Sequence, residues 1–397
     1  MIYIAVRMLL GDRAKYAGLI AGITFTSFLV TFAASYFTGF MTQGFALISE
    51  NGAADVWVME PAVEAVEQTT NMSWVALDRV RSVQGVASAV PLVVGTVQAR
   101  LPGGRVQPFQ VIGVDDASLP GIPPLRDGLS PMALRAPDAV VVDAGGTTDK
   151  LETPVDKADQ WPFAHPHLQA PARELAAGDE LLVNDRRVLV AGRSDGLPRY
   201  PPRPLFYTTL SHALRILPPE RRQLTFVLVR AANGVAARGL ATRIEAQTGL
   251  RAQSSADFKA STVRWILANS EDVGDIAAML TLAMSVGFGV TGIMLYMFTQ
   301  ENLRQYAVLS AMGTTARTLL SMIFAQAGLC ALIGTGLGIG LCSMLGSLAA
   351  NAGFPFRIMW FTPLFGALMV LVVSLVAAAL SARTVLKLQP MVVFSGR

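Results

Sequence analysis

The chain has 397 residues, of which 52% are hydrophobic and 15% are charged, and its mean hydropathy is +0.46. A composition this apolar lies outside the usual range of soluble domains and favours insertion into a membrane. The net charge is only +4, and the Lys and Arg residues beside the apolar runs account for it, so it is not evidence for binding nucleic acid. We expect membrane lipid, and no nucleic acid, among the partners.

The first 49 residues predict a surface helix followed by a membrane span. Residues 1–15 are apolar on one side and basic on the other, which is typical of an amphipathic helix on the cytoplasmic face of a membrane; a frayed extension of the span is the alternative. Residues 16–49 carry no charge and exceed the roughly 20 residues that cross a bilayer, so we assign them to the first transmembrane helix and a stalk. A cleaved signal peptide is the competing interpretation, but the run is longer than the usual apolar region of about 7–15 residues.

Residues 50–259 are polar and predict an exported α+β domain. Short β-rich runs alternate there with helical patterns. Asn184-Asp185 and Gly103-Gly104 lie between paired runs and predict tight hairpins, while residues 145–171 predict a long loop. The predicted strands are residues 55–59, 89–100, 106–114, 139–143, 180–184, 187–191, 205–208 and 224–230, and the predicted helices are residues 74–83, 210–217, 235–247 and 255–269.

The C-terminal part carries three further apolar windows. The fold class is therefore an α-helical membrane protein with four transmembrane helices and a large α+β periplasmic domain between helices 1 and 2. The remaining segments are 260–300 (stalk and second span), 301–317 (cytoplasmic segment), 318–350 (third span), 351–357 (short periplasmic turn), 358–382 (fourth span) and 383–397 (cytoplasmic tail).

Positive charges beside the spans predict the orientation, since cytoplasmic loops carry an excess of Lys and Arg. Arg7, Arg13 and Lys15 precede the first span, Arg304 and Arg317 lie between the second and third, and Arg383, Lys387 and Arg397 follow the fourth. The opposite turn offers only Arg357. Both termini should therefore be cytoplasmic in a bacterial inner membrane, with the large domain outside.

We considered enzymatic, metal and nucleotide sites and expect none in this chain. His165 and His167 are too few for a closed metal site, and His212 lies far from them in sequence. No phosphate-binding loop motif occurs, no catalytic triad spacing occurs, and no span holds an ionisable side chain that could drive transport. Cys330 and Cys342 are about 18 Å apart along one helix and cannot bridge.

The Gly-rich stretch GTGLGIG in the third span predicts close helix packing. Gly334 and Gly338, and likewise Gly336 and Gly340, are each four residues apart and give small-residue faces.

The charged segment 301–317, ENLRQYAVLSAMGTTAR, predicts a short helix and a return to the membrane. Helical projection turns an apolar set inward and a polar set toward water or a partner. The inward set is Leu303, Ala307, Leu309 and Ala311, and the outward set is Glu301, Arg304 and Gln305. Residues 312–315 should end this helix and cap the next one. A passive connector remains the alternative.

This segment, followed by a Gly-rich span, resembles the cytoplasmic loop of FtsX/MacB-type permeases of ABC transporters, the type VII, mechanotransmission class. The tail RTVLKLQPMVVF at residues 383–394 is similar to the basic tail of that module, and the topology is similar over the whole chain. VWVM at residues 56–59 and VIGVD at residues 111–115 make the likeness closest to the DevC-like branch.

The resemblance implies that segment 301–317 is a coupling helix docking on a separate ATPase subunit, which binds the ATP. The implied contact and turn residues are Glu301, Arg304, Gln305, Tyr306, Ala311, Met312 and Gly313. Gln305 and Leu309 depart from the charged residues of the macrolide-exporter branch. The resemblance further implies a homodimer, a periplasmic adaptor and an outer-membrane channel, with efflux driven by motion passed to the periplasmic domain. An FtsX-like regulator of a cell-envelope hydrolase and a lipoprotein-releasing permease are alternatives within the family.

Overall fold

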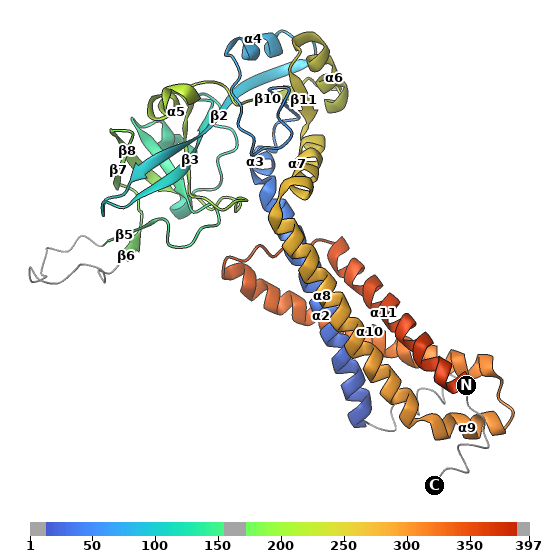
Figure 1. Ribbon diagram of the computed structural model, residues 1–397. Coiled ribbons are helices and arrows are strands. Elements are labelled where there is room, and N and C mark those ends of the chain that lie inside the picture. The colour runs from blue at the N-terminus through green and yellow to red at the C-terminus, as the bar shows by residue number, and fades with distance from the viewer. Residues whose placement is uncertain (1–12, 155–171, 387–397) are drawn as a thin grey trace, which may run out of the picture. The chain divides into compact units, whose positions relative to one another are not determined.

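The computed structural model describes residues 13–154 and 172–386 (Figure 1). The chain divides into two compact units. The helical unit comprises residues 1–40 and 271–397, and the α/β unit comprises residues 41–270. Residues 1–12 of the surface helix predicted over residues 1–15 lie outside the described residues, as do His165, His167 and the tail from residue 387.

The helical unit is built from long helices (Figure 1). In the described part of the chain, four helices are long and apolar enough to cross a membrane. Three start within three residues of the prediction, because uncharged runs with sharp polar ends leave little freedom of register. The helices of this unit are α2 (Arg13–Gly44), α8 (Glu271–Glu301), α9 (Leu303–Ala311), α10 (Ala316–Asn351) and α11 (Phe361–Leu386).

The α/β unit follows α2 in the chain and precedes α8. Its helices are α3 (Ala46–Glu50), α4 (Val75–Arg81), α5 (Leu210–Ile216), α6 (Ala237–Thr248) and α7 (Ser255–Asn269), with short turns η1 (Arg126–Gly128), η2 (Pro131–Arg135) and η3 (Pro219–Arg221). Its strands are β1 (Val56–Met59), β2 (Val86–Arg100), β3 (Val106–Val114), β4 (Ala139–Asp143), β5 (Glu152–Pro154), β6 (Ala172–Glu174), β7 (Glu180–Val183), β8 (Arg186–Arg193), β9 (Leu205–Thr209), β10 (Phe226–Ala231) and β11 (Arg251–Ser254).

The main sheet runs in the order β11-β1-β10-β2-β3-β9-β4-β8-β7. The far end of β2 also pairs with β7, through Ala99 opposite Val183. This pairing closes β2, β3, β9, β4, β8 and β7 into a barrel and removes free strand edges there. The start of β2 pairs instead with β10, so this one long strand belongs to both the barrel and an open part of the sheet covered by α4 and α6 (Figure 1).

Both predicted hairpins are confirmed. Val183 pairs with Arg186, and Asn184 and Asp185 have φ of 47° and 61°, as a two-residue turn of this hand requires. Gly104, with φ of 81°, donates to Leu101 O at 2.8 Å in the β2–β3 turn. Strands β5, β6 and β11 were not predicted. The RAQS run of β11 has no β-branched or aromatic residue, and it is extended because it pairs with β1.

The predicted stalk helices are interrupted where the sequence suggested continuity. The expected first helix, residues 16–49, breaks at Phe45 between α2 and α3, and the expected run through residues 260–275 breaks at Ser270 between α7 and α8. Gly44 is a weak helix former, and a Cβ atom there would come within 2.3 Å of Ile266 Cδ1. The end of α2 therefore packs directly on α7.

Three apolar clusters stabilise the α/β unit. One fills the barrel, one lies under α4 and α6, and the third joins α3 and α7 to strands of both parts of the sheet. In this third cluster the ring of Trp57 lies 5.4 Å from that of Phe226 and 5.6 Å from that of Phe258. Helices α3 and α7 are thus anchored by core packing, which is the largest stabilising contribution available to them.

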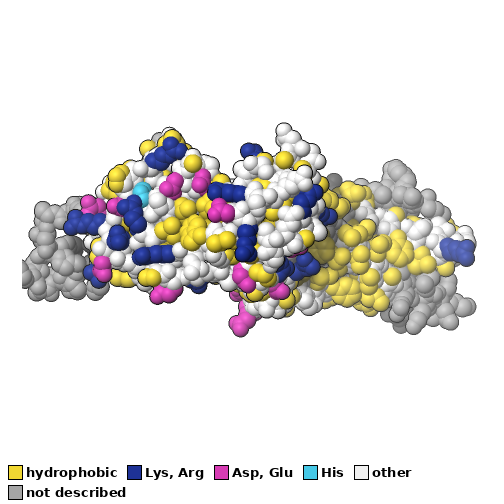
Figure 2. Space-filling view, turned by 90° about the horizontal axis from the view of Figure 1, so that it is seen from above, with side chains coloured by type: hydrophobic (Ala, Val, Ile, Leu, Met, Phe, Trp, Pro, Cys, Tyr) yellow, Lys and Arg dark blue, Asp and Glu magenta, His cyan; other side chains and the backbone are white. Residues whose placement is uncertain are grey.

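The two units differ in surface chemistry. Hydrophobic side chains crowd the surface of the long helices, whereas Lys, Arg, Asp and Glu side chains are scattered over the α/β unit (Figure 2). Apolar side chains exposed on long helices are expected where the solvent is lipid, because no hydrophobic penalty then applies.

Candidate functional site

Helix α9 presents one buried and one exposed face. Tyr306 and Ala307 are buried, while Arg304, Gln305 and Val308 are exposed. Residues three and four apart share a face of a helix, so the buried and the exposed positions of this short segment lie on separate faces. The exposed face continues into Met312, whose exposed fraction is 70%.

Tyr306 fixes α9 against its neighbours. Its exposed fraction is 1%, and its hydroxyl donates to Gln326 Oε1 of α10 at 2.8 Å. The ring belongs to an apolar cluster with Leu295 and Phe298 of α8 and Leu319 of α10. Burial raises the pKa of Tyr306 to about 12, so the phenol remains protonated and available as a donor at neutral pH.

A glycine turn ends α9 as predicted. Gly313 has φ of 90°, a conformation that costs a residue with a Cβ atom about 1–2 kcal/mol. Thr314 N donates to Leu309 O at 3.1 Å and Gly313 N to Ser310 O at 3.0 Å. These two bonds form a Schellman motif, which satisfies the last carbonyls of the helix. Thr315 then precedes α10 as its N-cap residue.

Two parts of the predicted arrangement need correction. Tyr306 was expected among the contact residues, but its burial leaves it no surface for a partner. Ala311 was expected to face apolar surroundings, but it is exposed. The reason is the same in both cases: the large tyrosine ring fills the space against α10, and this sets the rotation of the whole helix.

The remaining predicted contact residues lie on the surface. Glu301 ends α8 and is exposed, as are Arg304, Gln305 and Met312. Val308 is also exposed, although it was not among the predicted contact residues.

The four predicted packing glycines divide into two faces of α10. A Cβ atom on Gly334 would come within 2.7 Å of Ile23 Cγ2, and one on Gly338 within 2.5 Å of Ser27 Cβ, so this pair packs directly on α2. Among the described residues, Gly336 and Gly340 have no neighbouring atom within 4 Å of such a Cβ. Within the described part of the chain, the first pair therefore packs on another helix and the second pair does not.

Helix α2 also contacts α8 through small and hydroxyl side chains. Thr26 Oγ1 lies 3.1 Å from Gly287 O and 3.0 Å from Thr291 Oγ1. A Cβ atom on Gly287 would come within 2.5 Å of Thr26 Cγ2. Close approach and interhelical hydrogen bonds are the means by which helices associate in lipid.

Gln326 was missed by the sequence analysis. It is 3% exposed and accepts the hydrogen bond that holds α9. An amide inside an apolar run is itself a signal, because a buried polar group in such a helix needs a partner.

The described residues hold no group of three or more His, Cys, Asp or Glu side chains that could bind a metal ion. Cys330 and Cys342 are both buried and free.

The C-terminal stretch that contains α8, α9, α10 and α11 has known relatives. Residues 277–390 match the FtsX-like permease C-terminal family. This stretch is therefore similar to the C-terminal domain of FtsX-like permeases. Helix α9 and its glycine turn lie wholly within the FtsX-like domain. Together with the four apolar helices, the domain indicates a multi-pass membrane protein. No curated protein matches the chain in sequence.

Several solved structures are similar to part of the chain, and two of them are extracytoplasmic regions of known proteins. The periplasmic region of MacB from Actinobacillus actinomycetemcomitans has 13% identity and a TM-score of 0.35, over 54% of this chain and 94% of that one. The extracellular domain of the noncanonic ABC-type transporter YknZ from Gram-positive bacteria has 13% identity and a TM-score of 0.32, over 51% of this chain and 98% of that one.

Proposed function

We propose that this chain is the permease subunit of an ABC-type export system and that a separate ATPase docks on the exposed face of α9. The observation that carries the proposal is the FtsX-like domain, which contains an exposed helix held rigidly from behind by Tyr306. A docking helix must transmit movement to the membrane helices, and a side chain buried against α8 and α10 connects α9 firmly to them. The chain itself has no catalytic role in this proposal, and ATP is bound by the partner.

The proposed contact set follows from exposure. It comprises Glu301, Arg304, Gln305, Ala311 and Met312, with Val308 added. Gly313 is the turn residue, and Tyr306 becomes a positioning residue rather than a contact.

We place both termini and α9 in the cytoplasm of a bacterial inner membrane. The support is the distribution of Arg and Lys beside the spans, since orientation follows positive charge in short loops. The α/β unit is then periplasmic, inserted between the first and second spans, and α2 and α8 connect it to the membrane.

The proposed assembly contains a second permease copy, an ATPase pair, a periplasmic adaptor and an outer-membrane channel. ATP-driven movement of α9 would reach the α/β unit along α2 and α8, so that the substrate need not pass between spans that lack ionisable groups. The DevC-like branch, inferred from residues 56–59 and 111–115, belongs to the same proposal.

Site-specific photo-crosslinking tests the docking assignment. A benzoylphenylalanine at Val308 should form an adduct with an ATPase carrying a phosphate-binding loop, identified by mass spectrometry from membranes. The matched control is Leu332, 74% exposed on α10, where the same probe should not capture that ATPase. Adducts at Val308 that contain no nucleotide-binding protein would refute the proposal.

A further inference from the structure

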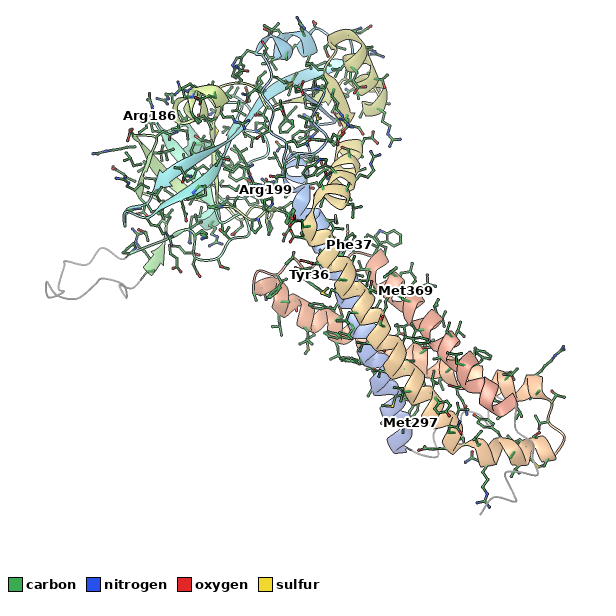
Figure 3. The ribbon with its side chains drawn as sticks, viewed as in Figure 1. Tyr36, Phe37, Arg186, Arg199, Met297 and Met369 are labelled. Atoms are coloured by element: carbon green, nitrogen blue, oxygen red, sulfur yellow. The ribbon has the colours of Figure 1, made fainter. Side chains whose placement is uncertain are left out.

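A buried charged cluster lies where α3 meets the barrel. Arg199, in the connection between β8 and β9, has a side chain only 2% exposed and pairs with Glu50, which is 6% exposed. Arg199 Nη2 donates to Glu50 Oε2 and to the Tyr207 hydroxyl at 2.8 Å. The Tyr207 hydroxyl in turn donates to Glu50 Oε2 at 2.8 Å. Figure 3 shows Arg199 beside α3.

The three side chains come from three different elements. Glu50 is the last residue of α3, which follows directly after α2. Tyr207 lies in β9, a barrel strand paired with both β3 and β4. Arg199 belongs to the connection between β8 and β9, and Leu197 N of the same connection donates to Glu50 Oε1 at 2.8 Å. Both carboxylate oxygens of Glu50 are therefore bound to the barrel side.

The same connection is tied at two further points. Asp143 Oδ2 of β4 accepts from Ser194 Oγ at 2.6 Å and from Gly196 N at 2.7 Å. Tyr200 Oη lies 2.8 Å from Oγ of Ser270, the residue between α7 and α8. The places where the chain enters and leaves the α/β unit are thus bound to one segment of the barrel.

The connection between β8 and β9 is tightly packed at Gly196. A Cβ atom on Gly196 would come within 2.9 Å of Asp143 Oδ2 and 3.1 Å of Glu50 Oε1. Nearby, Arg203 pairs with Glu67, so with Asp143 the cluster holds three acids and two arginines. Buried ion pairs add little net stability, because desolvation offsets their attraction, but breaking one leaves an uncompensated charge. Such a cluster enforces one geometry more than it adds stability.

We propose that Arg199 is a positioning residue that clamps the end of α3 to the barrel, so that the helix and the barrel move as one body. The inference rests on the proposed function only for the source of the movement, which is the ATPase acting through α2 and α8. The mechanical coupling itself is a property of the α/β unit.

Pulsed electron resonance distances test the clamp in the full chain. Spin labels on Arg186→Cys, exposed at the β7–β8 turn (Figure 3), and on Ala268→Cys, exposed on α7, report the barrel relative to the helices. The native cysteines are buried, so labelling is selective. We expect a narrow distance distribution in the otherwise unchanged protein and a broader or shifted one after Arg199→Met. An unchanged distribution in Arg199→Met would overturn the proposal.

Matched variants separate positioning from general damage. Arg238→Met removes the ion pair between Arg238, whose side chain is 78% exposed, and Asp257, whose side chain is 37% exposed. This change should leave the distance distribution narrow. Arg199→Lys should restore part of the narrowing, because it keeps the charge. If Arg199→Met fails to fold, Tyr207→Phe, which removes two hydrogen bonds at nearly constant volume, should broaden the distribution to a smaller extent; no broadening would count against the clamp.

The assembled complex distinguishes failure of the clamp from failure of the proposed function. Singly labelled chains with the partner ATPase report distances between two permease copies, with and without ATP and vanadate. With Arg199→Met we expect the nucleotide-dependent shift at residue 268 to persist and the shift at residue 186 to be lost, while ATP hydrolysis continues. Equal shifts at both positions would overturn the clamp. Absence of any shift in the unaltered protein would contradict the proposed function, and the intramolecular distances would still decide the clamp.

Discussion

Tyr306 and Gly313 show how single residues set the geometry of the candidate docking helix. The ring and hydroxyl of Tyr306 fix the rotation of α9, and the positive φ of Gly313 fixes where the helix ends. Arg304 and its exposed neighbours are then carried outward as a consequence. Tyr306 and Gly313 therefore determine which side chains of α9 are exposed and can contact the proposed partner.

The hydrogen bond between Tyr306 and Gln326 predicts a specific pattern of stability. Tyr306→Phe removes the hydrogen bond to the buried Gln326 Oε1 and should cost about 1–3 kcal/mol, while Tyr306→Phe combined with Gln326→Leu should cost less than the sum of the two single changes. Thermal unfolding of the full chain in detergent, arranged as a double-mutant cycle, measures this. Additive losses would show that the two side chains act independently.

Gly313→Val should uncouple the proposed ATPase contact without blocking membrane insertion. The β-branched residue disfavours the left-handed conformation, so the Schellman bonds weaken and α9 loses its fixed end. Copurification of the partner ATPase should fall, whereas Gly353→Val, also at positive φ in the described structure but in the α10–α11 turn, should leave it intact. Undiminished copurification with Gly313→Val would contradict the role of the turn.

At the scale of elements, α2 is the helix on which the others of the helical unit pack, and they contact it closely through glycine residues. Gly334 and Gly338 of α10, Gly287 of α8 and Gly366 of α11 each approach α2 too closely to accept a Cβ atom without movement. Small residues permit this approach, and dispersion and interhelical hydrogen bonds then hold the helices together. The apolar side chains left outside face the surroundings.

The two glycine pairs of α10 provide an internal comparison. Gly338→Val forces a side chain against Ser27 and the backbone of α2 and should lower the melting temperature of the chain by several degrees, in line with about 1–3 kcal/mol for an overpacked interface. Gly336→Val meets no neighbouring atom in the described part of the chain and should have little effect on the detergent-solubilised monomer. Equal losses would mean that both faces pack within one chain.

The elements of the α/β unit differ in how far sequence could predict them. Strands β3 and β4 match the predicted residues because β-branched runs end at turn residues, and α7 matches because Ser254 caps it by accepting from Asp257 N. The cluster of Glu50, Arg199 and Tyr207 could not be predicted, because its members are separated by long stretches of sequence. The rotation of α9 was equally out of reach, since a tyrosine suits either face of a short helix.

At the scale of the whole molecule, the structure combines a packed helical bundle with an α/β unit whose entry and exit segments are bound to one barrel. Closure of the barrel through β2 and β7 leaves a stiff body. Stiffness in that body and exposure at α9 are the two properties that the proposed transmission of force requires.

The stability of the molecule should depend on pH through buried acids outside the spans. Desolvation raises the pKa of Glu50 above its usual 4.5, despite the attraction of Arg199. A carboxyl group whose pKa is raised by folding binds its proton more tightly in the folded state than in the unfolded state. The contribution of Glu50 to stability therefore grows as the pH falls from the folded-state pKa to 4.5, and it is lost as the pH rises through the folded-state pKa. The unfolding free energy of the unaltered chain, relative to Glu50→Gln, should therefore rise on mild acidification.

His212 supplies the control of opposite sign. Burial lowers the pKa of His212 below its usual 6.5, so its contribution to stability is present above 6.5 and is lost as pH falls toward the folded pKa. Relative to His212→Gln, the unaltered chain should lose stability on the same acidification. Melting curves of the three proteins from neutral pH to 4.5 measure both differences, and parallel curves for Glu50→Gln and the unaltered chain would contradict the assignment.

The central claim is that the exposed face of α9 lies in the cytoplasm, where an ATPase can reach it. Labelling of Met312→Cys with a membrane-impermeant thiol reagent tests this directly, because Met312 is 70% exposed and both native cysteines are buried. We predict labelling in inverted inner-membrane vesicles and none in intact spheroplasts. Labelling from the outside of intact spheroplasts would contradict the account.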